Sequence, residues 1–251
     1  MKTIVIWSRK GGVGKTATVH ALGAALMQRK KKVLFVDCDA QGNLSLSMAA
    51  DEEAPGMYEV LADGESIENV IQTTPGGKIC GSSEELQMNI KVSPYRLKEE
   101  LQTISKKFDY CIIDCAANLG MVTINCLVAA DKIIIPVEAD LFSIQGIPRI
   151  IKPLEEVRSN YDAKADISGF LVTRYNNRSN INKMNLETLK TIAEIQHTKV
   201  YKTPIRECVA VKEAKQMQQS IFVYAPKSNA AADYTDFVKE FLNEKETISN
   251  G

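Results

Sequence analysis

The chain has 251 residues, enough to bury a sizeable core and typical of one large α/β domain. Its 31 Lys and Arg residues balance 31 Asp and Glu residues, so the formal net charge is zero. This balance excludes a strong overall attraction to nucleic acid or membrane and leaves only local patches for such contacts.

The first apolar run, at residues 3–7, is too short for a signal peptide. No segment approaches the ~18 apolar residues of a membrane-spanning helix. Six cysteines show no metal-ligand spacing, so we expect reduced thiols that fill core space. From these features we expect a cytoplasmic protein without a membrane partner.

Apolar runs of strand length alternate with helical periodicity through most of the chain. Continuous Val, Ile and Leu runs are typical of parallel strands buried on both faces. The pattern predicts strands at residues 3–7, 32–37, 110–114, 132–137, 167–173 and 199–201. It predicts helices at residues 17–29, 95–107, 119–130, 144–160, 180–196, 207–218 and 231–246.

This alternation predicts an α/β fold, a doubly wound and mostly parallel sheet with helices on both faces and ligands at the carboxyl ends of the strands. We expect a single domain over residues 1–246 and a polar tail over residues 247–251. Gly76 and Gly77 indicate a loop, and residues 89–93 fit either a strand or a helix. The sequence leaves the structure of residues 76–94 open.

A glycine-rich stretch, KGGVGKT at residues 10–16, follows the first predicted strand and precedes the first predicted helix. This order forms a phosphate-binding loop, because glycines let successive backbone N–H groups face phosphate oxygens and the helix dipole favours an anion. A turn with incidental lysines would not need seven matching residues in this context. The residues expected to bind the nucleotide are Gly11, Gly12, Val13, Gly14, Lys15, Thr16 and Ala17.

The loop carries more positive charge than its common form. Lys15 is placed to neutralise β- and γ-phosphate charge, and the Thr16 hydroxyl is placed to bind magnesium. The common loop has a glycine where this chain has Arg9, and Lys10 adds a second lysine before the double glycine. Two lysines around one loop indicate that one of them serves something beyond its own nucleotide.

Two aspartates lie at the ends of predicted strands. Asp39 lies just beyond the second strand, and Asp114 ends the strand at residues 110–114. A carboxylate at the first position would orient the attacking water, and one at the second would hold magnesium through a water, as a Walker B acid does. Each aspartate taken alone fits a helix N-cap or a turn equally well. Together with the loop, and in this order, both are predicted to belong to the site.

These motifs make the chain similar to the ParA/Soj partitioning ATPases, deviant Walker-A P-loop NTPases related to MinD and to nitrogenase iron protein. The resemblance covers nearly the whole chain. Its motifs are KGGVGKT at 10–16, VDCDAQGNLS at 36–45, YCIIDCAANLG at 110–120, NCLVAADKIIIPVEADLFSIQGI at 125–147, CVAVKEA at 208–214 and YAPKS at 224–228.

The resemblance implies an ATPase that uses ATP and Mg²⁺, forms a homodimer in the ATP state and partitions plasmid or chromosomal DNA. Its implied partners are non-specific DNA and a ParB-like protein that stimulates an otherwise weak hydrolysis. Lys10 would reach across the dimer to the partner's phosphates and act there like an arginine finger.

The resemblance also implies roles for individual positions of this chain. The implied catalytic residues are Lys10, Lys15 and Asp39. The implied magnesium residues are Thr16, Asp39 and, through a water, Asp114. Adenine would lie near Thr173, Arg174, Pro204 and Arg206.

The chain departs from the family pattern at three places. Cys115-Ala116-Ala117 replaces a Thr-Pro-Pro run, and Ala40 replaces a proline in the first switch. Ala210 replaces an arginine that the family uses for DNA binding, although Lys212 and Lys215 lie nearby and Arg206 precedes them. Any DNA binding by this patch is expected to be phosphate-driven and strongly salt-dependent.

Three alternatives follow from related proteins. A membrane ATPase of the MinD kind needs a basic amphipathic C-terminal helix, which residues 243–251 do not supply. An iron–sulfur ATPase needs a second cysteine to match Cys115 in a glycine-rich loop, so no metal cluster is expected. Ala210 leaves open a switch of the same family that lacks DNA binding and regulates or positions a protein partner.

Overall fold

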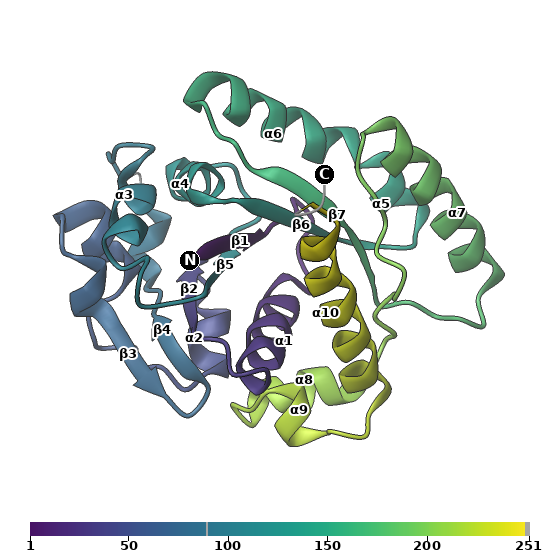
Figure 1. The fold of residues 1–251 in the computed structure, drawn as a ribbon, viewed down its shortest axis with the longest axis horizontal. Helices are drawn as coiled ribbons and strands as arrows, with labels where there is room; N and C mark the ends of the chain where they lie inside the picture. The colour runs from purple at the N-terminus through teal and green to yellow at the C-terminus, as the bar shows by residue number, and fades with distance from the viewer. Residues whose placement is uncertain (89, 249–251) are drawn as a thin grey trace.

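The computed structural model describes residues 1–88 and 90–248, and a seven-stranded sheet forms its centre (Figure 1). The strands lie in the order β3-β4-β2-β5-β1-β6-β7. Neighbours pair in parallel except β3 and β4, which form an antiparallel hairpin at one edge. The strands are β1 (Lys2–Ile6), β2 (Val33–Cys38), β3 (Ile71–Thr74), β4 (Gly77–Cys80), β5 (Tyr110–Cys115), β6 (Lys132–Glu138) and β7 (Asp166–Thr173).

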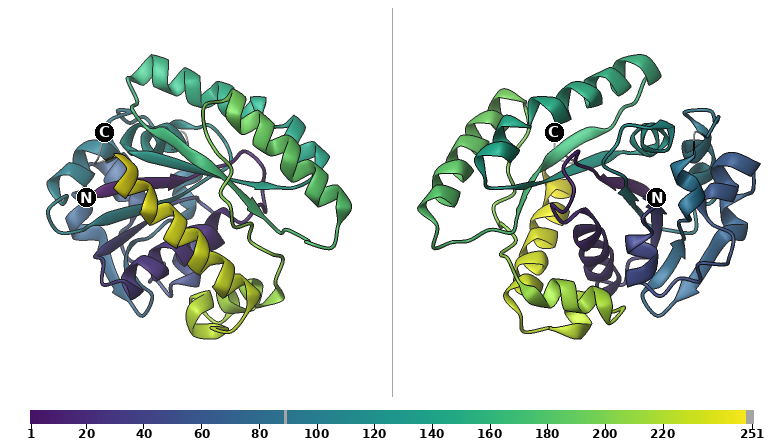
Figure 2. Two further views of the ribbon diagram at one scale, coloured as in Figure 1. Left: turned by 45° about the vertical axis from the view of Figure 1, so that its right-hand side comes forward. Right: turned by 180° about the vertical axis from the view of Figure 1, so that it is seen from behind.

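Helices cover both faces of the sheet (Figure 2), which confirms the predicted doubly wound α/β fold. The α-helices are α1 (Lys15–Gln28), α2 (Asn43–Ser47), α3 (Arg96–Thr103), α4 (Met121–Ala129), α5 (Leu141–Gln145), α6 (Pro148–Tyr161), α7 (Asn180–Ile195), α8 (Val209–Gln216), α9 (Ile221–Tyr224) and α10 (Asn229–Ile248). Shorter helical turns run over Glu59–Asp63, Ile67–Val70 and Glu84–Gln87.

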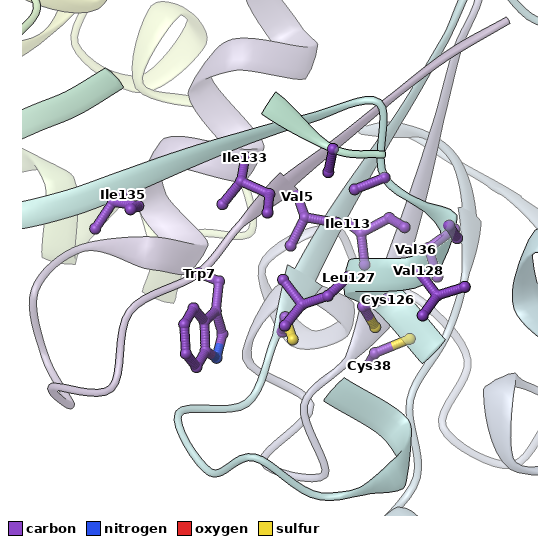
Figure 3. Packing of buried hydrophobic residues seen from close by; sticks show 14 of the residues in the cluster. Val5, Trp7, Val36, Cys38, Ile113, Cys126, Leu127, Val128, Ile133 and Ile135 are labelled. Atoms are coloured by element: carbon purple, nitrogen blue, oxygen red, sulfur yellow. The ribbon is translucent and has the colours of Figure 1, made fainter. Parts of the chain in front are cut away.

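Two hydrophobic cores lie on opposite faces of the sheet, because side chains alternate along each strand. Val5 and Trp7 belong to the core that α3, α4 and α6 cover, and Figure 3 shows them near Leu127 of α4. Ile4 and Ile6 belong to the other core, beneath α1 and α10. The central strand β1 is therefore enclosed on both faces, and its carboxyl end presents the glycine loop from a rigid base.

The last helix, α10, packs on α1 in the second core (Figure 2). Its Tyr234 and Phe237 are buried, as expected for a core-packing helix at residues 231–246. The helix runs to Ile248, and the rest of the predicted polar tail, residues 249–251, lies outside the described residues. In the part of the chain that the structure describes, no helix combines the length and the apolar character needed to cross a membrane.

The strand predicted at residues 199–201 is wrong. Val200 forms a single isolated bridge to Phe170 of β7. The backbone exchanges two hydrogen bonds with Phe170 there, from the Phe170 amide to Lys199 and from the Tyr201 amide to Phe170. The contact of this segment with β7 is too short to form a ladder, although Val200 and Tyr201 still pack into the hydrophobic cores.

The single helix predicted at residues 144–160 is wrong in its start and its continuity, because two helices, α5 and α6, occupy this region. Asp140 caps α5, and its carboxylate accepts a hydrogen bond from the Ser143 amide at 3.0 Å. Helix α6 begins at Pro148, which suits a first helical turn because that position needs no amide donor.

The β3–β4 hairpin was not predicted from the sequence. Its turn lies at Pro75 and Gly76, and Gly77 is the first residue of β4, so the loop expected at Gly76 and Gly77 is confirmed at Gly76. Gly77 has a φ of 126°, a conformation that glycine adopts without steric penalty. Residues 90–93 form neither of the two elements considered for residues 89–93, and residue 89 lies outside the described residues.

Candidate functional site

The glycine loop forms a cradle between β1 and α1. Gly14 precedes α1 in the left-handed conformation, with φ 86°, and no described side chain caps this helix. The first backbone N–H groups of an α-helix have no intrahelical partners, so in the absence of a cap they remain available to a ligand. Gly12 also has a positive φ of 75°, and no described atom lies within 4 Å of a Cβ position at Gly11 or Gly12. Open space at a helix N-terminus with free donors fits a phosphate chain.

Thr173 supports this loop from the end of β7. Its hydroxyl donates to the Val13 carbonyl oxygen at 2.8 Å, and its methyl carbon lies 3.7 Å from a Cβ position at Gly14. The Thr173 hydroxyl is thus bound to the glycine loop. The sequence analysis had placed Thr173 near adenine, and the residue does line the cavity. Lys15 opens α1 on the cavity side and is only 8% exposed.

The Asp114 carboxylate is fully buried at the carboxyl end of β5. In the sheet register it lies between Ile6 of β1 and Asp37 of β2. Its Oδ1 accepts a hydrogen bond from the Cys115 amide at 3.1 Å, whereas its Oδ2 has no hydrogen-bond partner among the described residues. A buried polar atom without a partner is costly, so a ligand at this oxygen would stabilise the site.

Electrostatics at Asp114 favour a cation. Burial raises the pKa of Asp114, and the neighbouring Asp37 carboxylate raises it further. The Thr16 hydroxyl and the Lys15 ammonium offset part of this rise. A bound divalent ion would add the positive charge that an ionised Asp114 lacks. The donor set of Thr16 and Asp114 therefore fits the magnesium expected from the sequence.

Asp39 lies in the turn between β2 and α2 and lines the same cavity as the glycine loop. Its amide donates to Asp37 Oδ1 at 3.2 Å, and its own Oδ1 accepts from the Gln41 amide at 3.1 Å. Its carbonyl oxygen accepts from the Gly42 amide at 2.8 Å. This turn holds the Asp39 carboxylate at the cavity wall, within a segment suited to orienting a water.

Lys10 is bound within its own chain. Its ammonium lies 2.5 Å from Glu138 Oε2 and 3.1 Å from both Asp140 Oδ2 and Ser143 Oγ. Arg174 also pairs with Glu138, at 3.2 Å. Partial burial disfavours the charged forms of both Lys10 and Asp140. Hydrogen bonds to Glu138 and Asp140 nevertheless raise the pKa of Lys10. Hydrogen bonds from Ser143 and Lys10 lower the pKa of Asp140 to about 2.

Sequence reasoning missed these partners of Lys10. The signal was present, because Glu138 and Asp140 are acids that follow the apolar strand predicted at residues 132–137. The rule that located Asp39 and Asp114, a carboxylate at or just beyond the carboxyl end of a parallel strand, applies to this strand as well.

The far wall of the cavity follows β7 and precedes α8. Arg174, with a left-handed φ of 50°, and Arg206 both line it. The Arg206 guanidinium donates to both carboxylate oxygens of Asp233 in α10, at 2.6 and 2.9 Å, and this pairing raises the pKa of Arg206. The charge of the Arg206 guanidinium is therefore balanced by Asp233 within the chain. Residues 176–178 also line this wall and were missed by the sequence analysis.

These segments enclose one cavity of 1410 Å³, above the roughly 300–1,000 Å³ usual for small-molecule sites. The predicted site residues that line it are Gly11, Gly12, Gly14, Lys15, Thr16, Ala17, Asp39, Thr173, Arg174 and Arg206. Lys10, Val13, Asp114 and Pro204 are not among the lining residues. The structure thus brings the glycine loop, the turn that carries Asp39 and the far wall together.

The comparisons with known proteins agree with this geometry. Residues 1–167 match a family model described as an AAA domain. The chain is 34% identical over 251 residues to the sporulation initiation inhibitor protein Soj of Bacillus subtilis (strain 168), covering 95% of this chain and 97% of that protein. It is 28% identical over 258 residues to the chromosome partitioning protein ParA of Caulobacter vibrioides, covering 98% and 95%.

A solved structure extends the similarity to the fold. Cobyrinic acid a,c-diamide synthase from Mycobacterium smegmatis, with bound ADP and magnesium, has a TM-score of 0.83 to this chain. The two are 25% identical, and the match covers 98% of this chain and 96% of that one. Given the extent of the match to Soj and the phosphate cradle after β1, the chain belongs to the ParA/Soj family of P-loop ATPases, which includes chromosome-partitioning proteins.

Proposed function

We propose that the chain is a Mg-ATP-dependent, dimerising ATPase switch that partitions plasmid or chromosomal DNA in the cytoplasm. The ATP-bound dimer binds non-specific DNA, and a ParB-like protein partner stimulates a hydrolysis that is weak alone. One observation carries the proposal: the free N–H groups of the glycine loop, Asp39 and the unpartnered oxygen of Asp114 meet at one edge of the sheet.

The chemistry assigned to these residues is ATP hydrolysis. Mg-ATP supplies the phosphoryl group, which is transferred to water with release of ADP. The loop N–H groups and Lys15 hold the negative charge of the phosphates, which is most of what such catalysis requires. The Thr16 hydroxyl and, through a water, Asp114 would hold the magnesium ion, which would offset phosphate charge. Asp39 orients the attacking water and belongs to the segment that responds when the γ-phosphate is lost.

Dimerisation gives Lys10 its role in this proposal. To reach the phosphates of a second subunit, Lys10 exchanges Glu138 and Asp140 for a ligand outside its own chain. Next to this pair, Leu141 and Phe142 of α5 are 57% and 79% exposed. Exposed apolar side chains beside a residue that must act in another subunit support a contact between copies of the chain.

The basic residues near α8 support a second candidate function, a switch that lacks DNA binding and regulates or positions a protein partner. Ala210 removes an arginine, Arg206 is paired with Asp233, and Lys215 donates to Asn43 Oδ1 at 2.5 Å. Of the basic residues expected near α8, two are thus already engaged in the chain. This favours a weak, local patch around Lys212 over a broad DNA-binding surface.

The proposal is tested with Asp39→Ala in the presence of ATP and magnesium. We expect the variant to bind ATP, to release phosphate at less than about a tenth of the wild-type rate, and to accumulate as a dimer in light scattering. Asp236→Ala, which changes an exposed acid on α10, is the matched control and is expected to behave as wild type. A monomeric, fully active Asp39→Ala protein would refute the proposal.

A further inference from the structure

A closed ring of hydrogen bonds holds the backbone of Asp39. The Asp39 amide donates to Asp37 Oδ1 at 3.2 Å. Both the amide and the hydroxyl of Ser45 donate to Asp37 Oδ2 at 2.8 Å. The Ser82 amide donates to Ser45 Oγ at 3.0 Å, and the Ser82 hydroxyl closes the ring by donating to the Asp39 carbonyl oxygen at 2.7 Å. Both backbone polar groups of Asp39 are thus tied to one ring.

The members of the ring are shielded from water. Asp37 is 0% exposed, Ser45 is 2% exposed and Ser82 is 9% exposed. Hydrogen bonds in such surroundings are stronger than at the surface, and their loss leaves a buried group without a partner. The ring is therefore able to hold the Asp39 turn before any nucleotide arrives.

Ser82 joins the ring from the hairpin at the edge of the sheet. It follows β4, and the preceding Gly81 carbonyl oxygen accepts a hydrogen bond from the Met57 amide at 2.8 Å. A Cβ at Gly56 would lie 2.5 Å from that oxygen, so the close approach requires glycine at position 56. The neighbouring segment at residues 56–57 thus helps to fix the backbone that presents Ser82.

We infer that Ser82 is a positioning residue for ATP hydrolysis, acting through the Asp39 carbonyl oxygen and the Ser45–Asp37 pair. Its hydroxyl is bound to the Asp39 carbonyl oxygen, and Ser82 does not line the cavity. It sets where the Asp39 turn, and with it the Asp39 carboxylate, stands relative to the glycine loop. The inference rests on the proposed role of Asp39 in orienting the attacking water.

The test separates positioning from binding and from folding. We expect Ser82→Ala to lower kcat about 3- to 10-fold, as loss of one buried hydrogen bond predicts. The Kd of a fluorescent ATP analogue is expected to change less than about twofold, because the loop is untouched. Ser82→Thr keeps the hydroxyl and is expected to retain at least about half of the wild-type kcat. Ser83→Ala, at the neighbouring position outside the ring, is the matched control.

Several results would overturn the inference. One is a wild-type kcat for Ser82→Ala, and another is a loss of kcat in this variant that is matched by an equal loss of ATP affinity. A third is a loss of kcat in Ser83→Ala as large as that in Ser82→Ala. If Ser82→Ala does not fold, Ser45→Ala opens the ring at another bond and must show the same split between kcat and affinity. Asp39→Ala distinguishes the two claims. If Asp39→Ala hydrolyses ATP normally, the proposed function fails. If Asp39→Ala is inactive but Ser82→Ala hydrolyses ATP normally, only the role of Ser82 is overturned.

Discussion

The Lys10 ammonium lies 2.5 Å from the Oε2 atom of Glu138 in the same chain. The Lys10 side chain is 43% exposed and the Glu138 side chain is 19% exposed, so the pair is at the rim of the site and within reach of another molecule. Under the proposed function, a dimer forms only when Lys10 leaves this partner. The contact within the chain therefore competes with the contact between chains.

Weakening this pair is expected to promote the dimer. In an Asp39→Ala background with ATP, Glu138→Gln should lower the protein concentration needed for half-maximal dimerisation by about 2- to 5-fold, the scale of a partly exposed ion pair. Analytical ultracentrifugation measures the change. Glu156→Gln, in the exposed pair with Lys152, is the control and should have no effect. A weaker dimer for Glu138→Gln contradicts the competition.

The glycine loop is tested at its buried lysine. Lys15→Ala is expected to weaken ATP binding by at least about 100-fold, because it removes a desolvated charge next to the phosphates. Lys10→Ala, which changes the lysine held by Glu138 and Asp140, is expected to leave ATP binding by the monomer within about threefold of wild type. Isothermal titration calorimetry measures the ATP affinity of the two variants. Micromolar affinity retained by Lys15→Ala would refute the phosphate-binding loop.

Packing of α1 on the sheet gives a prediction about stability. A Cβ at Gly23 would lie 2.2 Å from two ring carbons of Phe35, which is fully buried. Alanine favours a helix over glycine by about 1 kcal/mol, but overpacking a core costs about 1–3 kcal/mol. Since the clash is severe, Gly23→Ala is expected to lower the free energy of unfolding in urea by about 1–2 kcal/mol. Adding Phe35→Leu should recover part of the loss, and a variant as stable as wild type would contradict this packing.

The pH dependence of stability has a traceable contribution from His20. Burial lowers the pKa of His20 to about 4, below the value of about 6.5 expected in the unfolded chain. The unfolded chain therefore binds the proton more readily between pH 6.5 and 4. The stability that neutral His20 contributes is complete above pH 6.5 and is lost as the pH falls towards 4, by up to about 3 kcal/mol.

This effect is measured as a difference, because the buried Asp37 and Asp114 have raised pKa values and act in the opposite sense. We expect the free energy of unfolding of wild type, minus that of His20→Gln, to fall by about 2–3 kcal/mol between pH 7 and pH 4.5. Urea unfolding at both pH values gives this quantity. A difference that does not change with pH would show that His20 titrates alike in the folded and unfolded chains.

The central part of the site was predictable because its signals are local. The glycine loop is continuous in sequence, and Asp39 and Asp114 follow apolar strands whose carboxyl ends meet in any parallel sheet. Ser82 carried no such signal. It reaches Asp39 only through the β3–β4 hairpin, whose strands are four residues each and include the polar Gln72 and Thr73. Such short, partly polar strands lack a clear period.

The other errors have the same origin in tertiary contacts. Val200 and Tyr201 are apolar and pack into the two cores beside β7, but such packing alone does not specify a ladder. Arg206, which the sequence placed near adenine, lines the cavity, but its pairing with Asp233, 27 residues away, was not predicted. A pairing over that distance is fixed by the packing of α10, which the local sequence does not encode.

The most direct test of the account is DNA binding by Asp39→Ala with ATP and magnesium, across a salt titration on non-specific duplex DNA. We expect binding that requires ATP, that weakens steeply with salt because phosphate contacts dominate it, and that is reduced by Lys212→Ala. A protein that light scattering shows to be dimeric, yet that leaves DNA unbound at low salt, would contradict partitioning by direct DNA contact and favour the switch that serves a protein partner.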